Sequence, residues 1–468
     1  MSTKRFDENV KLDREYIYSL IENAKNTTTD EEIDRILEKA KNKKGLDHSE
    51  IASLLEIENE DQIKKLFKVA GEIKKNVYGN RVVLFAPLYI SDYCVNNCVY
   101  CGYKCKNKFQ RRRLTMDEIR QEVEVLEQMG HKRLALEAGE DPLNCPIEYV
   151  LESIKTIYDT YNKNGVIRRI NVNIAATTVE NYKKLKDAEI GTYILFQESY
   201  DEEVYKKMHP NCVKGNYEYH TTSFDRAMEA GIDDVGAGVL FGLADPKFEV
   251  LGLMMHNEHL EKKFGVGFHT ISVPRLRAAE GVSLETFPNL VSDDMFKKIV
   301  AIIRLAVPYT GMILSTREDE DMRKELLEYG ISQVSAGSCP GVGGYVASAG
   351  NEKTDQFETA DERTPIEVIS DLMDNNYIPS YCTACYRAGR TGEKFMNIAK
   401  SEKIHHMCKP NALTTLMEYA ADYGDEEFLK KAEKFVREQA ETIDREDIRN
   451  FALGNIEKIK NGERDLYI

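Results

Sequence analysis

The sequence lacks the apolar segments of a membrane or secreted protein. A transmembrane helix needs about 18 or more consecutive apolar residues, and no such run occurs in the chain of 468 residues. The first residues, MSTKRFDENVKLDREY, are too polar for a secretory signal peptide. We therefore expect a cytoplasmic protein that has no membrane partner.

An excess of positive charge is also missing. The formal net charge is -15 at pH 7 and the isoelectric point is about 5.3. Nucleic-acid binding normally needs a basic surface that neutralises phosphates, so we expect no nucleic-acid partner. One basic stretch is local and is either a solvated loop or a contact for an acidic partner. It contains Lys104, Lys106, Lys108, Arg111, Arg112 and Arg113.

A dinucleotide-binding fingerprint is missing as well, because no G-x-G-x-x-G follows the first predicted strand. From Arg81 onward the pattern is instead a strict alternation of strands and helices. The eight strand candidates are 82–90, 133–137, 170–175, 192–197, 235–241, 268–273, 312–315 and 332–336. Eight strands with eight helical crossovers predict an α/β fold, a closed TIM-type (β/α)8 barrel. An open doubly wound sheet is the alternative on periodicity alone.

Two further segments flank the predicted barrel of residues 81–375. Residues 1–80 have the pattern of charged amphipathic helices, at 11–24, 30–41, 48–55 and 61–76. The crossover helices of the barrel are expected at 116–129, 147–161, 179–188, 217–230, 248–264, 293–307, 318–328 and 365–374. Residues 376–468 are expected to form a helical C-terminal domain, with helices at 411–423, 426–441 and 445–460.

The chain has 10 cysteines. Because the cytoplasm keeps thiols reduced, they are better explained as metal ligands than as disulfides. Six of them form two patterns, described next. The other four fit no ligand pattern and are expected to be free or buried thiols. These are Cys105, Cys145, Cys212 and Cys339.

Cys94, Cys98 and Cys101 form a C-x3-C-x2-C pattern directly after the first predicted strand, where the reactive groups of a βα barrel gather. Three thiolates are one short of what a [4Fe-4S] cluster needs, so one iron keeps an open site for a substrate or cofactor. The alternatives are an incomplete zinc site or chance, and Tyr100 and the barrel pattern disfavour both. The spacing indicates chemistry that starts with reduction of S-adenosylmethionine.

Cys382, Cys385 and Cys408 form a second pattern, C-x2-C followed by a third cysteine after a long gap. A zinc site is a fair alternative, because C-x2-C is common in zinc proteins. His405 or His406 could then complete a tetrahedral set of ligands. Spacing alone does not separate zinc from an iron–sulfur cluster.

With the first cysteine motif, the sequence resembles the radical S-adenosylmethionine enzymes. In that superfamily the methionine part of the cofactor chelates the open iron, and reductive cleavage gives methionine and a 5'-deoxyadenosyl radical. The resemblance implies a set of cofactor-binding residues near the ends of strands one, two, four and five. They are Tyr100, Gly139, Glu140, Glu198, Tyr200 and the segment from Gly238 to Gly242.

Thr316 and Arg317 follow the seventh predicted strand in the string LSTRED. A guanidinium at the barrel mouth can bind a carboxylate bidentately and so fix an amino-acid substrate. The alternative is an ion pair with Glu318 or Asp319. The resemblance favours the first role, because aromatic-amino-acid lyases of the superfamily use an equivalent Ser/Thr-Arg pair as a carboxylate clamp.

A narrower resemblance spans about residues 84–423 and is to the tyrosine lyases that mature [FeFe]-hydrogenase. It is carried by both cysteine patterns with FHTISVPRLR at 268–277, AGS at 336–338 and GGY at 343–345. In that family the tail binds an auxiliary cluster, a [4Fe-4S] with a labile fifth iron bridged by free L-cysteine. The resemblance therefore selects iron–sulfur over zinc. It makes His269, near the barrel floor, the expected ligand of the labile iron, with His256 and His259 as rivals.

This resemblance also implies a reaction. L-tyrosine, held by Thr316 and Arg317, would lose hydrogen from its amino group and split into p-cresol and dehydroglycine, with Glu198 as a candidate proton relay. Dehydroglycine would then yield carbon monoxide and cyanide for an Fe(CO)2(CN)-cysteine unit of the hydrogenase H-cluster. Sites at both ends of the barrel imply an internal passage. The expected partners are other hydrogenase maturases and an electron donor such as ferredoxin or flavodoxin.

Three alternatives remain at this stage. The nearest is a 2-iminoacetate (dehydroglycine) synthase of thiamine biosynthesis, which needs no tail cluster. The others are a metal-binding scaffold and a radical lyase for another amino acid, such as tryptophan. The sequence also departs from the family pattern at Cys339 and at Asp245-Pro246, beside residues that matter for the site.

Overall fold

The computed structural model describes residues 10, 12–162, 165–347, 356–401 and 404–468. Its first helices are α1 (Arg14–Thr27), α2 (Asp30–Ala40), α3 (His48–Leu55) and α4 (Glu60–Tyr78). Each begins after a polar residue whose side chain accepts a backbone N–H, namely Asp13, Thr29, Asp47 and Asn59. The four predicted N-terminal helices are therefore present. Lys11, the expected first residue of α1, lies outside the described residues.

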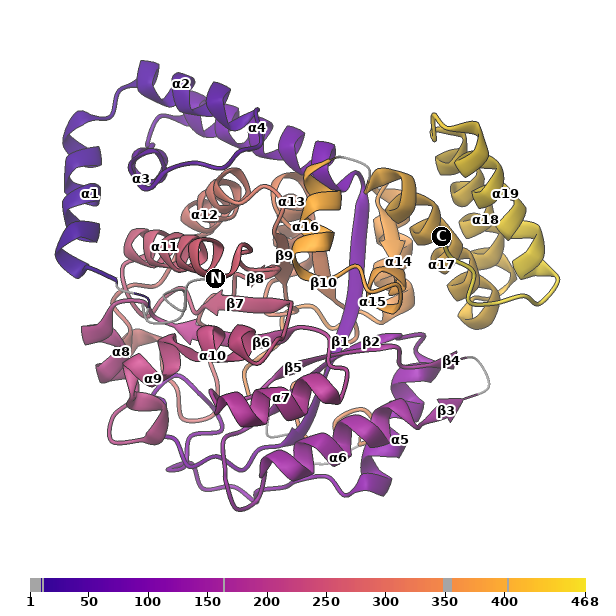
Figure 1. The fold of residues 1–468 in the computed structure, drawn as a ribbon, viewed down its shortest axis with the longest axis horizontal. Helices are drawn as coiled ribbons and strands as arrows, with labels where there is room; N and C mark the ends of the chain where they lie inside the picture. The colour runs from indigo at the N-terminus through magenta and orange to yellow at the C-terminus, as the bar shows by residue number, and fades with distance from the viewer. Residues whose placement is uncertain (1–9, 11, 163–164, 348–355, 402–403) are drawn as a thin grey trace, which may run out of the picture.

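Eight parallel strands close into a barrel at the centre of the molecule (Figure 1). They are β1 (Arg81–Ser91), β2 (Arg133–Ala138), β5 (Arg169–Asn173), β6 (Tyr193–Glu198), β7 (Val235–Val239), β8 (Thr270–Ser272), β9 (Gly311–Leu314) and β10 (Gln333–Ser335). Neighbours pair in chain order, and β10 pairs with β1 to close the ring, with Val83 opposite Gln333. The predicted (β/α)8 barrel is confirmed and the open sheet is excluded.

Helices surround the barrel at the predicted places, with one break. The crossover helices are α5 (Met116–Gln128), α6 (Ile147–Tyr158), α7 (Val179–Asp187), α11 (Pro246–Phe264), α12 (Asp293–Ala306), α13 (Glu320–Tyr329) and α14 (Pro365–Asp374). The single helix predicted at 217–230 is instead two, α9 (Tyr217–Thr221) and α10 (Ser223–Glu229). At the break the hydroxyls of Thr221 and Thr222 donate to the carbonyls of Tyr217 and Glu218, which competes with the regular helix pattern.

A short strand that the sequence did not predict, β11 (Ile378–Ser380), pairs in parallel with the first residues of β1. Arg81 lies opposite Ile378, and Val83 lies opposite Ser380. Strand patterns of three residues that contain a proline, here Pro379, are too weak to detect. This pairing fixes residues after the expected boundary at 375 to the barrel floor, which we define as the amino-terminal end of the strands.

The rest of the tail is helical and is drawn in orange to yellow (Figure 1). It contains α15 (Ala384–Arg387), α16 (Gly392–Lys400), α17 (His405–Tyr423), α18 (Glu426–Glu441) and α19 (Glu446–Lys460). Helix α17 packs against α18, α19 and β11, and it begins six residues before the expected start and contains Pro410. Cys408 is thereby placed on a helix rather than in a loop. No described helix is long and apolar enough to cross a membrane.

The N-terminal helices cover the outer helices α11, α12 and α13 on one side of the barrel (Figure 1). The contact between these N-terminal helices and the barrel helices is partly polar. The buried ammonium of Lys298 on α12 donates to the carbonyls of Leu55 and Ile57 at 3.0 and 2.8 Å. These helices extend the molecule without lining the barrel interior.

Arg304 on α12 joins two backbone segments near the floor, residues 308–310 and Gly330. Its guanidinium is fully buried and donates to the carbonyls of Pro308, Thr310 and Gly330 at 2.7 to 3.1 Å. Replacing Arg304 with methionine leaves these acceptors buried without donors. We expect Arg304→Met to lower the free energy of unfolding by about 3 kcal/mol or more.

Guanidinium chloride unfolding of the ligand-free protein, followed by circular dichroism, measures this effect. Arg437→Met is the control, because Arg437 forms only exposed ion pairs with Glu433 and Glu457 on the tail. That change should cost less than about 1 kcal/mol. Similar midpoints for the two variants would contradict a structural role of Arg304.

Candidate functional site

The first cysteine loop follows β1 at the carboxyl ends of the strands. A backbone hydrogen bond of 3.2 Å from Cys101 to Cys98 closes the turn between these two residues. The thiols of Cys94, Cys98 and Cys101 all line one cavity, which we call the top cavity. The space within it, including the part that is open to solvent, is about 940 Å³.

Asn96 fixes this cysteine loop to three neighbouring loops. Its Nδ2 donates to Glu140 at 2.5 Å, and its Oδ1 accepts from the backbone N–H of Lys214 at 2.9 Å. Its carbonyl accepts from the backbone N–H of Cys105 at 2.7 Å. The positions of the three thiols are therefore set by the surrounding barrel loops.

The chemistry of these thiols fits an iron–sulfur cluster. Burial raises the pKa of Cys94, and it raises the pKa of Cys101 to about 11. Such thiols become thiolates at neutral pH only when a metal binds. Within the described ranges, no three His, Cys, Asp or Glu side chains converge closely enough for a single metal ion. A [4Fe-4S] cluster takes one thiolate per iron, so its ligands need not converge on a single ion.

The structure brings several expected cofactor-binding residues to the top cavity. Tyr100, Gly139, Glu140 and Glu198 line it, and the Tyr100 hydroxyl lies 2.7 Å from Nε2 of His209. Gly139 can only be small, because a Cβ there would lie 2.3 Å from the carbonyl oxygen of Tyr93. This close approach lets the backbone after β2 pack directly against the cysteine loop.

Tyr200 is not brought to the top cavity. Its ring is buried between the barrel and α11, its hydroxyl lies 3.0 Å from Nδ1 of His256, and its backbone N–H donates to Glu249. Both Tyr200 and His256 are thus part of the core beneath the site.

Gly238 in the fifth barrel strand, β7, and Gly242 just after it are each explained by a different structural requirement for glycine. A Cβ at Gly238 would lie 2.5 Å from the ring of Phe196, which itself lines the cavity, and Gly242 has a φ of 121°. Neither glycine lines the top cavity, but Leu240 between them does. The segment therefore reaches the cavity with a different residue from those expected.

Lys214 is a residue of the top cavity that sequence analysis missed. It lies on the short 3-10 helix η2 (Val213–Gly215), and its ammonium is 2.7 Å from Glu198. Both side chains are largely buried. Burial lowers the pKa of Lys214, but the neighbouring negative charges, led by the carboxylate of Glu198, raise it above its ordinary value. A lone lysine in the string NCVKGN gives no signal by which it could have been found.

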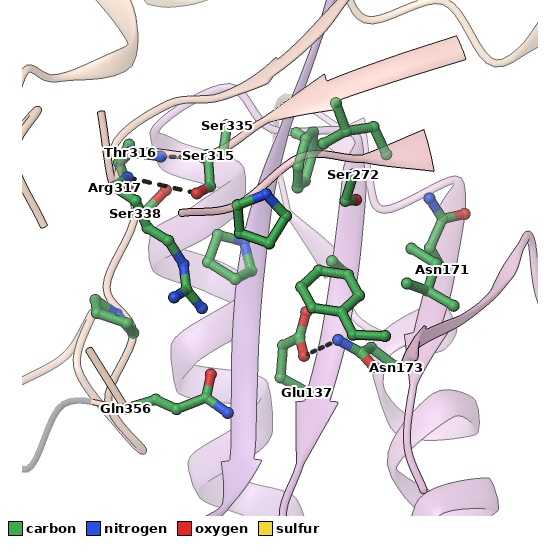
Figure 2. Close-up of a pocket in the computed structure, with 18 of the residues that line it drawn as sticks. Glu137, Asn171, Asn173, Ser272, Ser315, Thr316, Arg317, Ser335, Ser338 and Gln356 are labelled. Atoms are coloured by element: carbon green, nitrogen blue, oxygen red, sulfur yellow. Dashed lines mark hydrogen bonds between the residues drawn. The ribbon is translucent and has the colours of Figure 1, made fainter. Parts of the chain in front are cut away.

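A second cavity, the interior cavity, lies inside the barrel and shares residues with the top cavity (Figure 2). Arg317 lies in both, and its guanidinium stacks over the ring of Phe357 at 3.5 Å. Among the described residues no carboxylate forms an ion pair with Arg317. The expected competitors are engaged elsewhere, because Glu318 pairs with Arg275 and Asp319 accepts from the first turn of α13. A buried guanidinium of this kind is suited to the carboxylate of a ligand.

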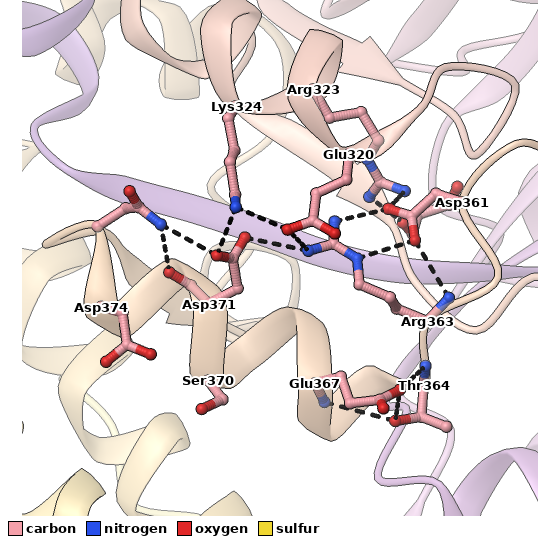
Figure 3. Close-up of polar contacts among 12 residues, drawn as sticks. Glu320, Arg323, Lys324, Asp361, Arg363, Thr364, Glu367, Ser370, Asp371 and Asp374 are labelled. Atoms are coloured by element: carbon pink, nitrogen blue, oxygen red, sulfur yellow. Dashed lines mark hydrogen bonds and ion pairs between the residues drawn. The ribbon is translucent and has the colours of Figure 1, made fainter.

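The loop that carries Thr316 and Arg317 is held by a buried ion-pair network (Figure 3). Asp361 pairs with Arg323 at 2.6 Å and with Arg363 at 2.7 Å. The backbone N–H groups of Ala360 and Asp361 donate to the carbonyl of Thr316 at 2.8 and 3.2 Å. The network therefore fixes the backbone directly before Arg317.

The second cysteine pattern lies at the opposite end of the barrel. Cys382 follows β11, Cys385 lies on α15, and Cys408 lies on α17, and all three line one cavity, the floor cavity. Burial raises the pKa of Cys382. Neither His405 nor His406 lines this cavity, and Nε2 of His405 lies 2.5 Å from the carbonyl of Asn76. The histidines of the zinc alternative are therefore not gathered with the thiols.

His269 lies in the floor cavity with the three cysteines. Its Nε2 is 3.2 Å from the hydroxyl of Tyr386, and its Nδ1 is 3.2 Å from a carboxylate oxygen of Asp234. Burial lowers the pKa of His269 and so favours the neutral imidazole that metal binding requires. The rival His259 is not in this cavity and pairs with Asp225 on α10.

The three cavities adjoin in series along the barrel. The top and interior cavities share Glu137 and Arg317, and the interior and floor cavities share Arg133 and Gln333. Arg133 forms no ion pair with the described residues, and its one side-chain hydrogen bond there is to the Tyr386 hydroxyl at 3.4 Å. This arrangement is the one required by the predicted internal passage. Asp234, Arg133 and Tyr386 were missed, although Tyr386 directly follows Cys385 in the motif.

Glu137 in the interior cavity accepts a hydrogen bond of 2.7 Å from Asn173, and burial raises its pKa to about 8. Below the ordinary pKa of 4.5 the carboxyl is protonated in both the folded and the unfolded protein, so its ionisation does not affect folding stability. As pH rises from 4.5 to 8, only the unfolded state loses the proton, so folding stability falls.

We therefore expect Glu137→Gln to be more stable than the parent by an amount that grows from pH 5 to pH 8 and then levels off. Urea midpoints of the ligand-free proteins at several pH values provide the measurement. A difference independent of pH would show that Glu137 is ionised in the folded protein.

Two family models match the chain. The Radical SAM superfamily model matches residues 88–251, and the Biotin and Thiamin Synthesis associated domain matches residues 272–378. The first spans the cysteine loop of the top cavity, and such a domain implies a [4Fe-4S] cluster and S-adenosylmethionine. The second ends at the start of β11 and therefore leaves out the tail cysteines.

Solved structures resemble nearly the whole chain. A crystal structure of HydG, a maturase of the [FeFe]-hydrogenase, is 57% identical with a TM-score of 0.95, and the match covers 97% of this chain and 99% of that one. HydG from Carboxydothermus hydrogenoformans is 39% identical with a TM-score of 0.83, covering 95% and 97%. The 2-iminoacetate synthase of Salmonella typhimurium is 28% identical over 337 residues, 72% of this chain and 87% of that protein.

The two HydG structures match the chain through the tail, whereas the synthase match covers a smaller share of it. The chain therefore belongs to the radical S-adenosylmethionine superfamily and, within it, to the family of the [FeFe]-hydrogenase maturase HydG.

Proposed function

We propose that this chain is a tyrosine lyase of [FeFe]-hydrogenase maturation. It cleaves L-tyrosine to p-cresol and dehydroglycine, and it converts dehydroglycine to carbon monoxide and cyanide for an Fe(CO)2(CN)-cysteine unit. The observation that supports this most directly is the position of two cysteine triads at opposite ends of one barrel, with adjoining cavities between them. We assign substrate cleavage to residues 81–375 and assembly of the iron product to the floor site with residues 376–468.

In the top cavity, Cys94, Cys98 and Cys101 would hold the [4Fe-4S] cluster, which with S-adenosylmethionine supplies a 5'-deoxyadenosyl radical. Arg317 binds the carboxylate of tyrosine, and the ring of Phe357 fixes the plane of its guanidinium. Glu137 is neutral at pH 7, because its pKa is about 8, and so it does not repel that carboxylate. Thr316 completes the clamp at the start of the loop.

The ion pair with Lys214 bears on the role of Glu198. The hydrogen bond of 2.7 Å from the Lys214 ammonium keeps this carboxylate in one orientation. We therefore propose that Glu198 orients polar groups of the cofactor, in preference to relaying protons. Lys214 acts as a positioning residue through Glu198.

Dehydroglycine must cross the barrel without hydrolysis. The interior cavity is lined partly by apolar side chains, including Val273, Pro274 and Ile313, which limit access of water. Arg133 at the boundary with the floor cavity can pair with the carboxylate of the intermediate, because no described carboxylate occupies it. The interior cavity thus has a guanidinium at each end, Arg317 towards the top cavity and Arg133 towards the floor cavity.

At the floor, Cys382, Cys385 and Cys408 are the proposed ligands of the auxiliary cluster. His269 is the proposed protein ligand of the labile iron, which with free L-cysteine is cargo of the reaction. The carboxylate of Asp234, 3.2 Å from Nδ1, favours the tautomer that keeps the proton on Nδ1 and leaves Nε2 to bind iron. Other hydrogenase maturases would receive the product.

The nearest alternative is a 2-iminoacetate synthase, to which the chain is related at lower identity. Such an enzyme would release dehydroglycine and would not need the tail cysteines gathered with His269. A radical lyase for tryptophan would keep Arg317 but release no p-cresol. A scaffold would cleave no S-adenosylmethionine in the presence of tyrosine.

Cys382→Ala tests the proposed function. The reconstituted variant should form p-cresol at a rate within about twofold of the parent, because the top cavity is unchanged, and assembly of the iron product should be lost. Chromatography of p-cresol and infrared spectroscopy of iron-bound carbon monoxide and cyanide measure the two outcomes. Cys98→Ala is the matched control and should lose both. Complete loss of p-cresol in Cys382→Ala would contradict the separation of the two sites.

His269→Ala tests the floor ligand. The variant should cleave tyrosine at the parent rate but bind the labile iron more weakly by about tenfold or more. Iron quantification and electron paramagnetic resonance of the auxiliary cluster supply the readout, and His48→Ala, on the outer helix α3, is the control. Unchanged iron content and spectra would mean that His269 only fills the barrel floor.

A further inference from the structure

The basic stretch beside the top cavity has two parts. Its arginines are bound to the protein: Arg111 donates to the carbonyls of residues 92, 103 and 104, Arg112 pairs with Glu118, and Arg113 donates to the carbonyl of Asn144. Lys106 and Lys108 are exposed, and neither forms a hydrogen bond or ion pair with the described residues. These two lysines therefore offer positive charge to solvent.

This part of the chain is rigidly tied to the cysteine loop. The backbone N–H of Cys105 donates to Asn96, and that of Lys104 donates to the carbonyl of Cys101 at 3.2 Å. The amide of Asn107, between the two lysines, donates to the carbonyls of Gly102 and Glu280 at 2.7 and 2.8 Å. The lysines are thus held within a few residues of a proposed cluster ligand.

Exposed apolar side chains gather around the same loop. Val95, Leu143 and Val213 are 40%, 84% and 60% exposed, and they are three of the ten large apolar side chains that are strongly exposed in the described residues. Each is close in the chain to a group bonded to the cysteine loop. Val95 donates its N–H to the carbonyl of Glu140, the loop from Glu140 carries Leu143, and Val213 precedes Lys214, which is bonded to Asn96. We define the docking face as Val95, Lys106, Lys108, Leu143 and Val213.

A face of this composition has the character of a protein interface. Exposed apolar residues beside charged ones mark interaction sites on otherwise polar surfaces. Because the whole chain has a net charge of -15, an acidic protein would be repelled by most of its surface. The docking face offers such a protein local attraction, which steers its encounter to this position.

We propose that the docking face binds an acidic one-electron carrier protein, with a flavin or an iron–sulfur cluster, that reduces the cluster of the top cavity. The proposal rests on the proposed function, which needs one electron from outside for each cleavage of S-adenosylmethionine. In this step the reduced carrier loses one electron and the cluster gains it, and no bond forms or breaks. A maturase that receives the iron product is assigned to the floor instead, where that product forms.

The test is charge reversal at the two free lysines, in the double variant K106E/K108E of the reconstituted protein. Reduction of the cluster by reduced flavodoxin, followed by stopped-flow absorbance, should be slower by about tenfold or more at low ionic strength. For the parent, the rate should fall as salt is raised from about 20 to 300 mM, and this dependence should largely disappear in the variant. L143S should slow the same step without changing its dependence on salt.

The matched control is K430E/K434E, which makes the same charge change on α18, on exposed lysines of the C-terminal domain. Its rate with flavodoxin should equal that of the parent. Reduction by dithionite, a small reductant that needs no docking, should be the same in all variants. Equal flavodoxin rates for K106E/K108E and K430E/K434E would overturn the proposal.

Failure of the proposed function gives a different result. If the parent forms no p-cresol from tyrosine when reduced by dithionite, the tyrosine lyase activity is wrong, whichever carrier is used. If dithionite supports p-cresol formation while the lysine reversals leave the flavodoxin rate unchanged, only the docking face is wrong. The two conclusions are therefore tested by separate measurements.

Discussion

The arrangement of both sites depends on the length and the pairing of one strand. β1 runs for 11 residues, from Arg81 at the floor cavity to Ser91 before the cysteine loop, which corresponds to about 35 Å of extended chain. Its first residues pair with β11, and it closes the barrel against β10. One strand therefore holds the tail cysteines at its start and the first cysteine loop just beyond its end. This length separates the two sites, and so would separate the two reactions proposed for them.

The barrel interior contains polar groups at some cost to stability. A TIM barrel is normally filled by apolar side chains, but here Glu137, Asn173, Arg133 and Arg317 line the interior cavity. Burial raises the pKa of Glu137 and lowers the pKa of Arg317, so the empty protein disfavours both charged forms. In the proposed reaction, the substrate carboxylate would give Arg317 the ion-pair partner that no described residue provides. The proposed binding of an amino acid would therefore use a group that is costly to the empty core.

The sequence predicted the elements that have a long period or a tight spacing. Eight strands and the loop of Cys94, Cys98 and Cys101 follow from alternation and from thiol spacing, which are local properties. β11 was missed because three residues carry no period, and Lys214 because a pair with Glu198 depends on how two loops meet. His269 was separable from His256 and His259 only through the resemblance to known enzymes. In the structure the distinction is physical, because His269 alone of the three lies in the cavity of the tail thiols.

The floor site differs from the top site in how it is assembled. Enzymes of this architecture place their chemistry at the carboxyl ends of strands, as the top cavity does. At the floor, the barrel contributes Arg133 and His269 from the amino-terminal ends, while the three thiols come from elements after residue 375. The top site is therefore complete without the tail, but the floor site is not. Because β11 joins the barrel sheet directly through β1, the segment just before Cys382 is held at the barrel floor by strand pairing rather than by a movable domain contact. The separation between the two sites is then set by the barrel itself.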